Sequence, residues 1–116
     1  MANKNKYSGD CSNIILPIMD TLDVINGKWK ILIIISIKHG NKRFGEIEKS
    51  IPKLSSKVLA KELKDLEIHQ LVTRTVYDGY PVSIEYATTE YAETLSNLIT
   101  EMKLWGQQHR KKIMAK

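Results

Sequence analysis

Residues 55–67 carry the pattern that most restricts how this chain can fold. Leu59, Leu63 and Leu66 recur at positions i, i+4 and i+7, so they share one face of a helix. Ser55 can accept a hydrogen bond from an amide of the first turn and is the expected N-cap. The opposite arc holds small and cationic side chains, namely Ser56, Lys57, Ala60, Lys61 and Lys64. The sequence therefore predicts an amphipathic helix whose outer, positive face suits contact with phosphate.

A β-hairpin is predicted directly after this helix. Residues 71–77 and 83–88 alternate in polarity and are rich in β-branched side chains, which is typical of strands. Residues 78–81 between them include Asp78 and Gly79 and have the composition of a turn. The loop of the hairpin is therefore expected to project from the domain.

Several shorter helices are predicted before the amphipathic one. The first begins at Pro17, which suits a first turn, and ends before Gly27. Residues 28–39 could form a buried strand or a buried helix by periodicity alone, but their length and the glycine that follows favour a helix. A short helix around Ile47 then ends at Pro52.

A long last helix is predicted from Thr89, a suitable cap, to about residue 113. A stripe of side chains follows the spacing of a helix that packs along another helix: Tyr91, Leu95, Leu98, Met102, Trp105 and His109. This stripe could cover the chain's own core. However, a helix of about 24 residues extends about 36 Å, which is longer than a small domain covers from within. We therefore expect part of the stripe to pack against a second copy.

Length and composition indicate a single globular domain. The chain has 116 residues, of which 42% are hydrophobic and 27% are charged. We expect a flexible arm over residues 1–13 and one domain over residues 14–116. The single cysteine, Cys11, cannot form an intramolecular disulfide, and we find no signal-peptide pattern, so we expect a cytoplasmic protein. No apolar run approaches the roughly 20 residues that span a bilayer.

The positive charge is concentrated in one segment. The net charge is +5, and residues 42–64 alone hold seven cations and three carboxylates, an excess of +4. On charge alone this segment could be a solvated helix face. The order of the elements instead describes a mainly α winged helix-turn-helix with a small hairpin, a fold that binds duplex DNA. The candidate DNA contacts are Arg43, Lys53, Ser55, Ser56, Lys57, Lys61 and Lys64, and the candidate wing residues are Arg74, Gly79, Tyr80 and Ser83.

The sequence has no pattern for a metal site or an enzyme. His39, His69 and His109 are scattered, with no second ligand at i+3 or i+4. Asp20 and Asp23 fit the polar face of a helix better than an acid/base pair, and no glycine-rich phosphate loop or nucleophile elbow occurs. We predict no catalysis, no metal and no cofactor.

Three stretches resemble the signatures of HxlR-type bacterial transcriptional regulators, relatives of the MarR group. They are residues 20–30, which include Gly27-Lys28-Trp29-Lys30, residues 43–47 and residues 84–90. The resemblance spans about residues 16–110. It implies a winged-helix homodimer on operator DNA, with residues 55–67 in the major groove and Arg43 on the DNA backbone. It also implies that the first and last helices form the dimer interface, so that Leu22 joins the stripe from Tyr91 to His109.

This sequence departs from the family pattern at two places. The family commonly carries a Cys-Pro pair before the first helix, through which several members sense electrophiles or oxidants. Here the pair reads Leu16-Pro17, and the thiol lies upstream at Cys11. The family's wing usually carries paired prolines and a basic residue, whereas residues 78–83 contain one proline and no Lys or Arg. The wing is therefore expected to contact DNA weakly.

Together these features predict a homodimeric regulator that binds operator DNA and represses by occlusion. Cys11 could be a sensor of oxidants or electrophiles, or an inert exposed thiol. The alternative function is a protein-interaction module that presents the same basic face to an acidic protein. No cluster of polar residues identifies a small-molecule effector.

Overall fold

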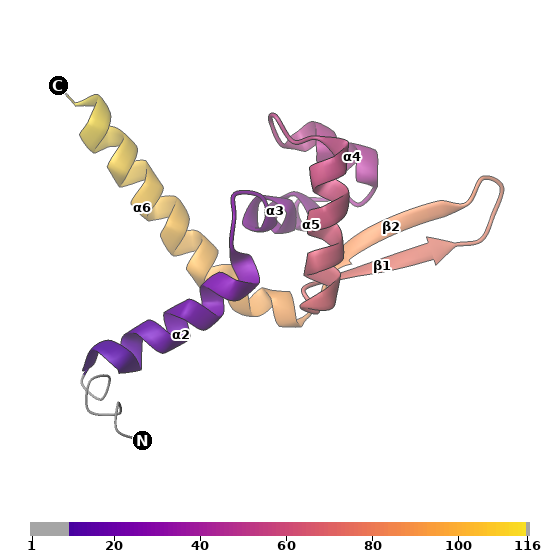
Figure 1. Cartoon of the computed structure of the whole chain (residues 1–116). Coiled ribbons are helices and arrows are strands. Elements are labelled where there is room, and N and C mark those ends of the chain that lie inside the picture. The colour runs from indigo at the N-terminus through magenta and orange to yellow at the C-terminus, as the bar shows by residue number, and fades with distance from the viewer. Residues whose placement is uncertain (1–9, 116) are drawn as a thin grey trace, which may run out of the picture.

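The computed structural model describes residues 10–115 of the chain (Figure 1). Its elements are α2 (Asp10–Ile25), α3 (Lys30–Lys38), α4 (Phe44–Ser50), α5 (Ser56–Ile68), β1 (Val72–Tyr77), β2 (Ser83–Thr88), the 3₁₀-helix η1 (Tyr91–Leu95) and α6 (Ser96–Met114). This arrangement of helices around one antiparallel hairpin is a winged helix-turn-helix, as the sequence predicts.

The core is built mainly by α3 and α5. The leucine stripe of α5 faces inward as predicted, because Leu59, Leu63 and Leu66 are at most 1% exposed. The isoleucine run of α3 is helical, which resolves the ambiguity of its sequence, and Ile33 and Ile34 are fully buried. The other buried apolar residues are Ile37, Ile47, Ile51, Leu54, Leu71, Val72, Tyr86 and Ala92.

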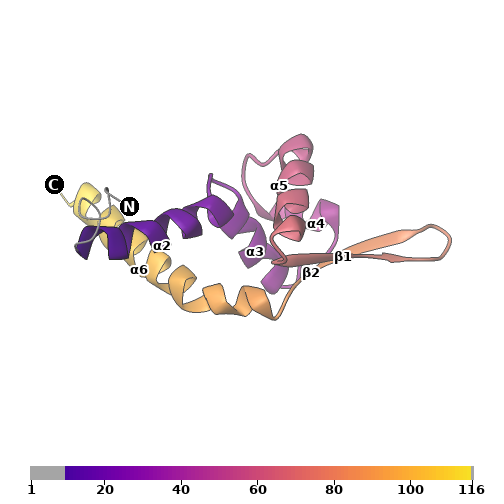
Figure 2. The same ribbon diagram turned by 60° about the horizontal axis from the view of Figure 1, so that its bottom comes forward.

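The hairpin is anchored at its base and projects as a wing. Its register runs from Val72 opposite Thr88 to Tyr77 opposite Ser83. The amide of Tyr86 donates to the carbonyl of Lys42 at 2.7 Å, which ties β2 to the segment before α4. Figures 1 and 2 show the wing extending from the side of the core opposite to α2 and α6.

The first helix begins earlier than the sequence predicts. α2 starts at Asp10, so Pro17 lies inside the helix and not in its first turn. Pro17 has no amide to donate to the carbonyl of Asn13, but this part of α2 is exposed, and water can satisfy that carbonyl. Residues 10–13, which we expect in a flexible arm, are therefore helical, whereas residues 1–9 of that arm lie outside the described part of the chain.

The last helix is also different from the continuous rod that we predict. Thr89 is a cap as expected, since its hydroxyl accepts from the Ala92 amide at 3.1 Å and donates to the Gln70 carbonyl at 2.7 Å. The next turn is the 3₁₀-helix η1, and the α-helix starts only at Ser96. Ala92 is buried against the core, and this tight attachment favours the narrower winding that is common at helix starts.

The two terminal helices extend away from the core. The radius of gyration is 17.9 Å, compared with about 13 Å expected for a compact domain of this length. Large apolar side chains on both helices are exposed in the single chain, including Ile14, Ile18 and Leu22 on α2 and Trp105 on α6. We call α2 and α6 together the terminal arms.

Candidate nucleic-acid interface

The turn between α4 and α5 sets the direction of the predicted recognition helix. Ile51 and Leu54 are each 7% exposed and attach the turn to the core. Lys53 between them has a φ of 67°, in the left-handed region, where the chain changes direction. Ser55 then caps α5 as predicted, since its hydroxyl oxygen accepts from the Val58 amide at 3.2 Å.

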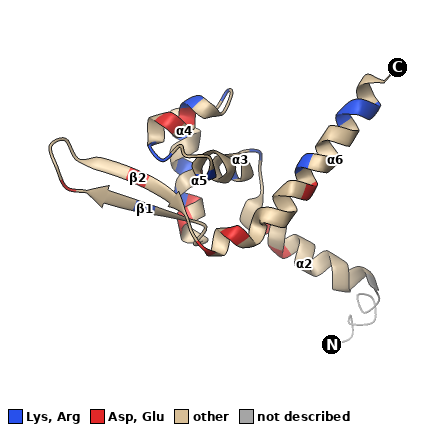
Figure 3. Cartoon of the chain, turned by 180° about the vertical axis from the view of Figure 1, so that it is seen from behind, with Lys and Arg blue, Asp and Glu red and all other residues tan. Residues whose placement is uncertain are grey.

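The outer face of α5 is exposed along the length of the helix. The exposed residues on and beside it are Lys53, Ser55, Ser56, Lys57, Ala60, Lys61 and Lys64. Figure 3 shows Lys and Arg on α4, on α5 and on the turn that joins them. The face that the sequence predicts to be cationic is therefore open to a partner.

Two polar contacts lie on this face. The Ser56 hydroxyl donates to Glu48 Oε2 at 2.8 Å, so its lone pairs remain available to a donor on a partner. Lys61 Nζ lies 3.7 Å from Asp65 Oδ2, but the lysine side chain is 71% exposed. An exposed pair of this kind contributes little free energy, so the Lys61 ammonium can exchange Asp65 for another anion.

Arg43 lies between α4 and the wing. Its Nη2 is 3.8 Å from Glu85 Oε2 on β2, and Lys42 Nζ is 4.0 Å from Glu85 Oε1. Both cations remain more than half exposed. Lys42 is not among the contacts that we predict, although its position next to Arg43 in a basic segment was a usable signal. Together they extend the positive surface from α5 toward β2.

Glu46 holds the start of α4. Its Oε1 accepts from the amides of Lys42 and Arg43 at 3.0 and 3.1 Å. These hydrogen bonds stabilise the carboxylate and lower the pKa of Glu46 below its ordinary value of 4.5. The segment that carries Arg43 is therefore held in place by a charged cap.

A buried ion cluster joins α5 to the start of α3. Lys30 is 4% exposed, and its Nζ lies 2.6 Å from Glu62 Oε1 and 3.4 Å from Asp65 Oδ2. Burial would lower the pKa of Lys30, but the hydrogen bonds and charges of Glu62 and Asp65 outweigh it and raise the pKa above 10.5. Our sequence prediction does not include this cluster. The usable signal was Glu62, which falls next to the leucine stripe on the helix, where a charge needs a partner.

The wing presents three of its four candidate residues to solvent. Arg74, Gly79 and Tyr80 are exposed, and Tyr80 lies in the loop at the end of the hairpin. Asp78, which directly follows β1, is an acidic residue at the start of this loop. Ser83 differs from the expected surface contact, because its hydroxyl oxygen is buried and lacks a hydrogen-bond partner within the described residues. It starts β2 with that oxygen turned away from solvent.

Many residues of the predicted dimer interface are exposed in the single chain. Leu22, Met102 and Trp105 are 54%, 47% and 65% exposed. The ring of His109 stacks on that of Trp105, with centroids 4.9 Å apart. α2 adds exposed apolar residues that our prediction does not include, namely Ile14, Ile15, Leu16, Ile18 and Met19.

The 3₁₀ turn changes the first part of the predicted stripe. Leu95 packs against the core from η1, and Leu98 is half-buried, while Tyr91 remains 59% exposed. The break between η1 and α6 means that Tyr91 and Leu95 do not continue the helical spacing of the residues after them. The exposed part of the stripe on α6 therefore begins near Met102.

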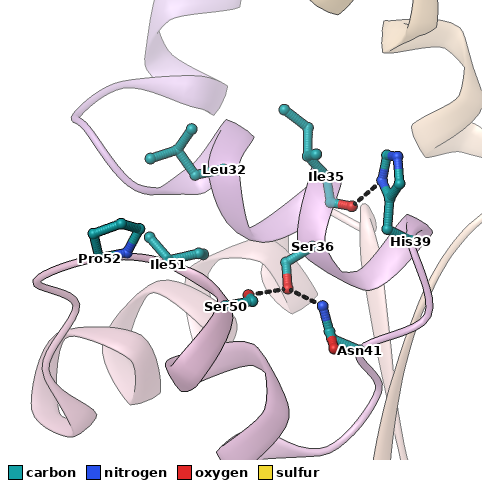
Figure 4. Close-up of a pocket in the computed structure, with 8 residues that line it drawn as sticks. All are labelled: Leu32, Ile35, Ser36, His39, Asn41, Ser50, Ile51 and Pro52. Atoms are coloured by element: carbon teal, nitrogen blue, oxygen red, sulfur yellow. Dashed lines mark hydrogen bonds between the residues drawn. The ribbon is translucent and has the colours of Figure 1, made fainter.

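A pocket of about 350 Å³ lies between α3 and the end of α4 (Figure 4). Three of its polar side chains, those of Ser36, Asn41 and Ser50, bond to one another. Asn41 donates to Ser36 Oγ at 3.2 Å, the hydroxyls of Ser36 and Ser50 are 2.6 Å apart, and Ser50 donates to the Ile47 carbonyl at 2.8 Å. Since the Ser50 proton goes to Ile47, Ser36 must donate to Ser50. The chain of bonds ties α3 to α4 and leaves neither hydroxyl proton free for a ligand.

The described residues contain no group of three or more His, Cys, Asp or Glu side chains that could hold a metal ion. Between Asp10 and Ala115, no helix combines the length and the apolar character needed to cross a membrane. Cys11 is a free, exposed thiol in the first turn of α2.

The family model described as HxlR-like helix-turn-helix matches residues 24–114. The chain belongs to this family. This HxlR-type protein is thus a helix-turn-helix transcriptional regulator and not an enzyme, as the sequence predicts.

Individual relatives agree with this assignment. The uncharacterized HTH-type transcriptional regulator YdeP of Bacillus subtilis is 38% identical over 97 residues, which cover 84% of this chain and 76% of YdeP. The reduced form of the redox regulator HypR has a TM-score of 0.74 at 38% identity, covering 86% of this chain and 99% of HypR. A structure described as a MarR-family regulator from Enterococcus faecalis V583 has a TM-score of 0.74 at 27% identity, covering 89% and 94%. The HxlR-type regulator is thus structurally similar to the MarR group.

Proposed function

We propose that this HxlR-type regulator binds a pseudo-palindromic operator as a homodimer and represses transcription by occluding it. The observation that carries the proposal is the outer face of α5. Lys57, Lys61 and Lys64 are exposed there and are not covered by other parts of the described chain. An α-helix fits the major groove, and its flanking cations neutralise phosphates.

The residues divide between positioning on the backbone and reading of bases. Lys57, Lys61 and Lys64 bind phosphates, together with Arg43 and Lys53 on either side of α4. Ser55 and Ser56 at the N-terminus of α5 meet base edges, because the first residues of a recognition helix enter the groove most deeply. The wing adds a weaker contact through Arg74, Gly79 and Tyr80.

The homodimer is supported by the terminal arms. Apolar side chains on α2 and α6, among them Leu22, Met102 and Trp105, are exposed in the single chain. An exposed apolar surface of this kind is typical of a protein–protein interface. A second copy related by a two-fold axis supplies the same surface in return. Two copies of α5 then enter successive major grooves about 34 Å apart.

Selection of bound duplexes from a random DNA pool tests this function. We expect enrichment of a palindromic sequence, and footprinting on it should protect two half-sites about one helical turn apart. Enrichment of no sequence would reject sequence-specific binding and favour the alternative, a module that presents its basic face to an acidic protein. Placing the enriched sequence over a promoter in a transcription assay then distinguishes a repressor from an activator.

We also infer that any response of this regulator to oxidants passes through Cys11. The chain contains one cysteine, and its thiol is exposed on a terminal arm. The similar protein HypR is described as a redox regulator. Diamide should change the affinity of the wild type for the selected duplex and leave Cys11→Ser unaffected. Equal responses of the two proteins would exclude Cys11 as a sensor.

A further inference from the structure

Lys30 lies where three parts of the molecule meet. It is the first residue of α3, and its ammonium donates to Asn26 Oδ1, in the turn after α2, at 3.3 Å. The same ammonium donates to Glu62 Oε1 on α5 at 2.6 Å and lies 3.4 Å from Asp65 Oδ2. The Lys30 side chain therefore connects the turn after α2 to α5, the helix that we propose faces DNA.

The turn that Lys30 spans contains a flexible residue. Gly27 has a φ of 82°, and glycine adopts many other backbone conformations at low cost. The bond between Asn26 and Lys30 closes over this residue, so it limits the directions in which α2 can leave the core. Without it, the direction of α2 would depend on apolar packing at its last turns, where Val24 contacts the core.

A buried ion pair connects Lys30 to α5. The side chains of Lys30 and Glu62 are 5% and 11% exposed, so both charges are largely shielded from water. A buried charge without its partner is strongly unfavourable, which keeps the pair together. Asp65 is shared with Lys61 on the outer face, so the cluster also reaches a residue that we assign to phosphate binding.

We propose that Lys30 is a positioning residue for operator recognition, which fixes the direction of α5 relative to the terminal arm α2. The proposal rests on the function proposed above. In a homodimer joined through the terminal arms, this direction decides how far apart the two recognition helices lie. Lys30 therefore controls which spacing of half-sites the dimer accepts, although it does not touch DNA.

The spacing preference tests this role. The probes are the duplex selected by the wild type and two derivatives with one or two base pairs inserted between the half-sites. We expect wild type to bind the inserted duplexes at least about tenfold more weakly, and Lys30→Met to lose most of this discrimination. The matched control is Lys28→Met, two positions before Lys30, which removes the same charge from a lysine whose Nζ lies 4.9 Å from the centroid of the Trp29 ring. A folded Lys30→Met protein with the wild-type spacing preference would overturn the proposal.

A second measurement needs no DNA and leaves Lys30 in place. Spin labels at Asp23→Cys on α2 and Lys64→Cys on α5, in a Cys11→Ser background, report the distance between the two helices. Dilution with unlabelled protein removes distances between copies. Glu62→Gln keeps a hydrogen-bond acceptor but loses the charge, and we expect it to broaden the distance distribution relative to wild-type Glu62. Equal widths would reject the positioning role, whereas failure to enrich any duplex would reject only the proposed function.

Discussion

Lysine has two different roles in this protein, and burial decides which. Lys57, Lys61 and Lys64 extend from α5 into solvent, where their charge is available to an anion. Lys30 is buried and neutralised by Glu62 and Asp65. The exposed ammonium groups are thus open to an anionic partner, whereas the buried one joins α3 to α5.

Removing single exposed lysines from α5 should weaken DNA binding in a salt-dependent way. We expect Lys57→Ala and Lys61→Ala each to reduce the slope of log affinity against log salt by about 0.9, because each neutralised phosphate releases counterions. Lys112→Ala, at the far end of α6, is the matched control and should leave the slope unchanged. Fluorescence anisotropy with the selected duplex at several salt concentrations measures it. An unaltered slope in both α5 variants would remove them from the phosphate contacts.

The stability that Lys30 contributes to the fold should be lost at alkaline pH. The pKa of Lys30 is raised above 10.5 in the folded chain, so the contribution is complete below about 10.5 and is lost as pH rises through the folded pKa. Lys30→Met should lower the free energy of unfolding by about 3–5 kcal/mol at neutral pH, because it leaves Glu62 buried without a cation. Denaturant unfolding between neutral and strongly alkaline pH checks this. Lys28→Met should change stability by no more than about 1 kcal/mol, and a difference between wild type and Lys30→Met that stays constant with pH would contradict the ion pair.

At the scale of elements, caps and turns fix where each helix begins. Ser55, Glu46 and Thr89 each accept backbone amides at the start of a helix or of the η1 turn. The Lys53 turn and the Ser55 cap together determine how α5 leaves the core, since Leu54 between them is buried. The face that α5 presents thus depends on a few residues before it.

Ser55→Ala should destabilise the domain by about 1 kcal/mol, because the Val58 amide loses its acceptor. Chemical denaturation in the absence of DNA isolates this effect from any loss of base contact. Ser56→Ala serves as the control, since its hydroxyl makes an exposed bond to Glu48, and the expected change is within about 0.5 kcal/mol. Equal losses in the two variants would mean that the cap contributes nothing specific.

At the scale of the whole molecule, two different surfaces lie on opposite sides of the described part of the chain. The wing and α5 lie on the core, and the terminal arms extend on the other side (Figures 1 and 2). One surface carries the exposed lysines of α5 and the other carries exposed large apolar side chains of α2 and α6, which suits binding of DNA at the first and of a second copy at the second.

A charge in the apolar surface should separate the proposed dimer. Trp105 is 65% exposed on α6, and Trp105→Glu would bury an unpaired carboxylate in the interface. We expect analytical ultracentrifugation to report a folded monomer that binds the selected duplex at least about a hundredfold more weakly, since two half-sites are no longer engaged together. Val82→Glu introduces the same charge at an exposed apolar site on the wing and should remain dimeric. A Trp105→Glu protein that is still a dimer would place the interface elsewhere.

Features that depend on neighbouring residues were predictable. The leucine spacing of α5, the Ser55 and Thr89 caps, the glycine after α3 and the two strands are each signalled by residues within a few positions of one another in the sequence. The two predictions of element bounds that needed correction have different origins. The 3₁₀ turn at Tyr91–Leu95 follows from the burial of Ala92 against the core. The start of α2 at Asp10, before Pro17, has no such contact, because the first turns of that helix are exposed in the single chain. The buried hydroxyl of Ser83 depends on neighbours that the sequence pattern does not identify.

The amino-acid pattern alone was enough to specify a winged helix-turn-helix and the cationic, outward face of α5, because hydrophobic periodicity decides which face of a helix is buried. It did not specify that Lys30 lies against Glu62, 32 positions away, or that Arg43 and Lys42 meet Glu85 on the wing. Those pairs exist because α3 packs on α5 and β2 lies beside the start of α4. Two charges that are far apart in sequence can pair only where the packing of apolar faces places their elements side by side.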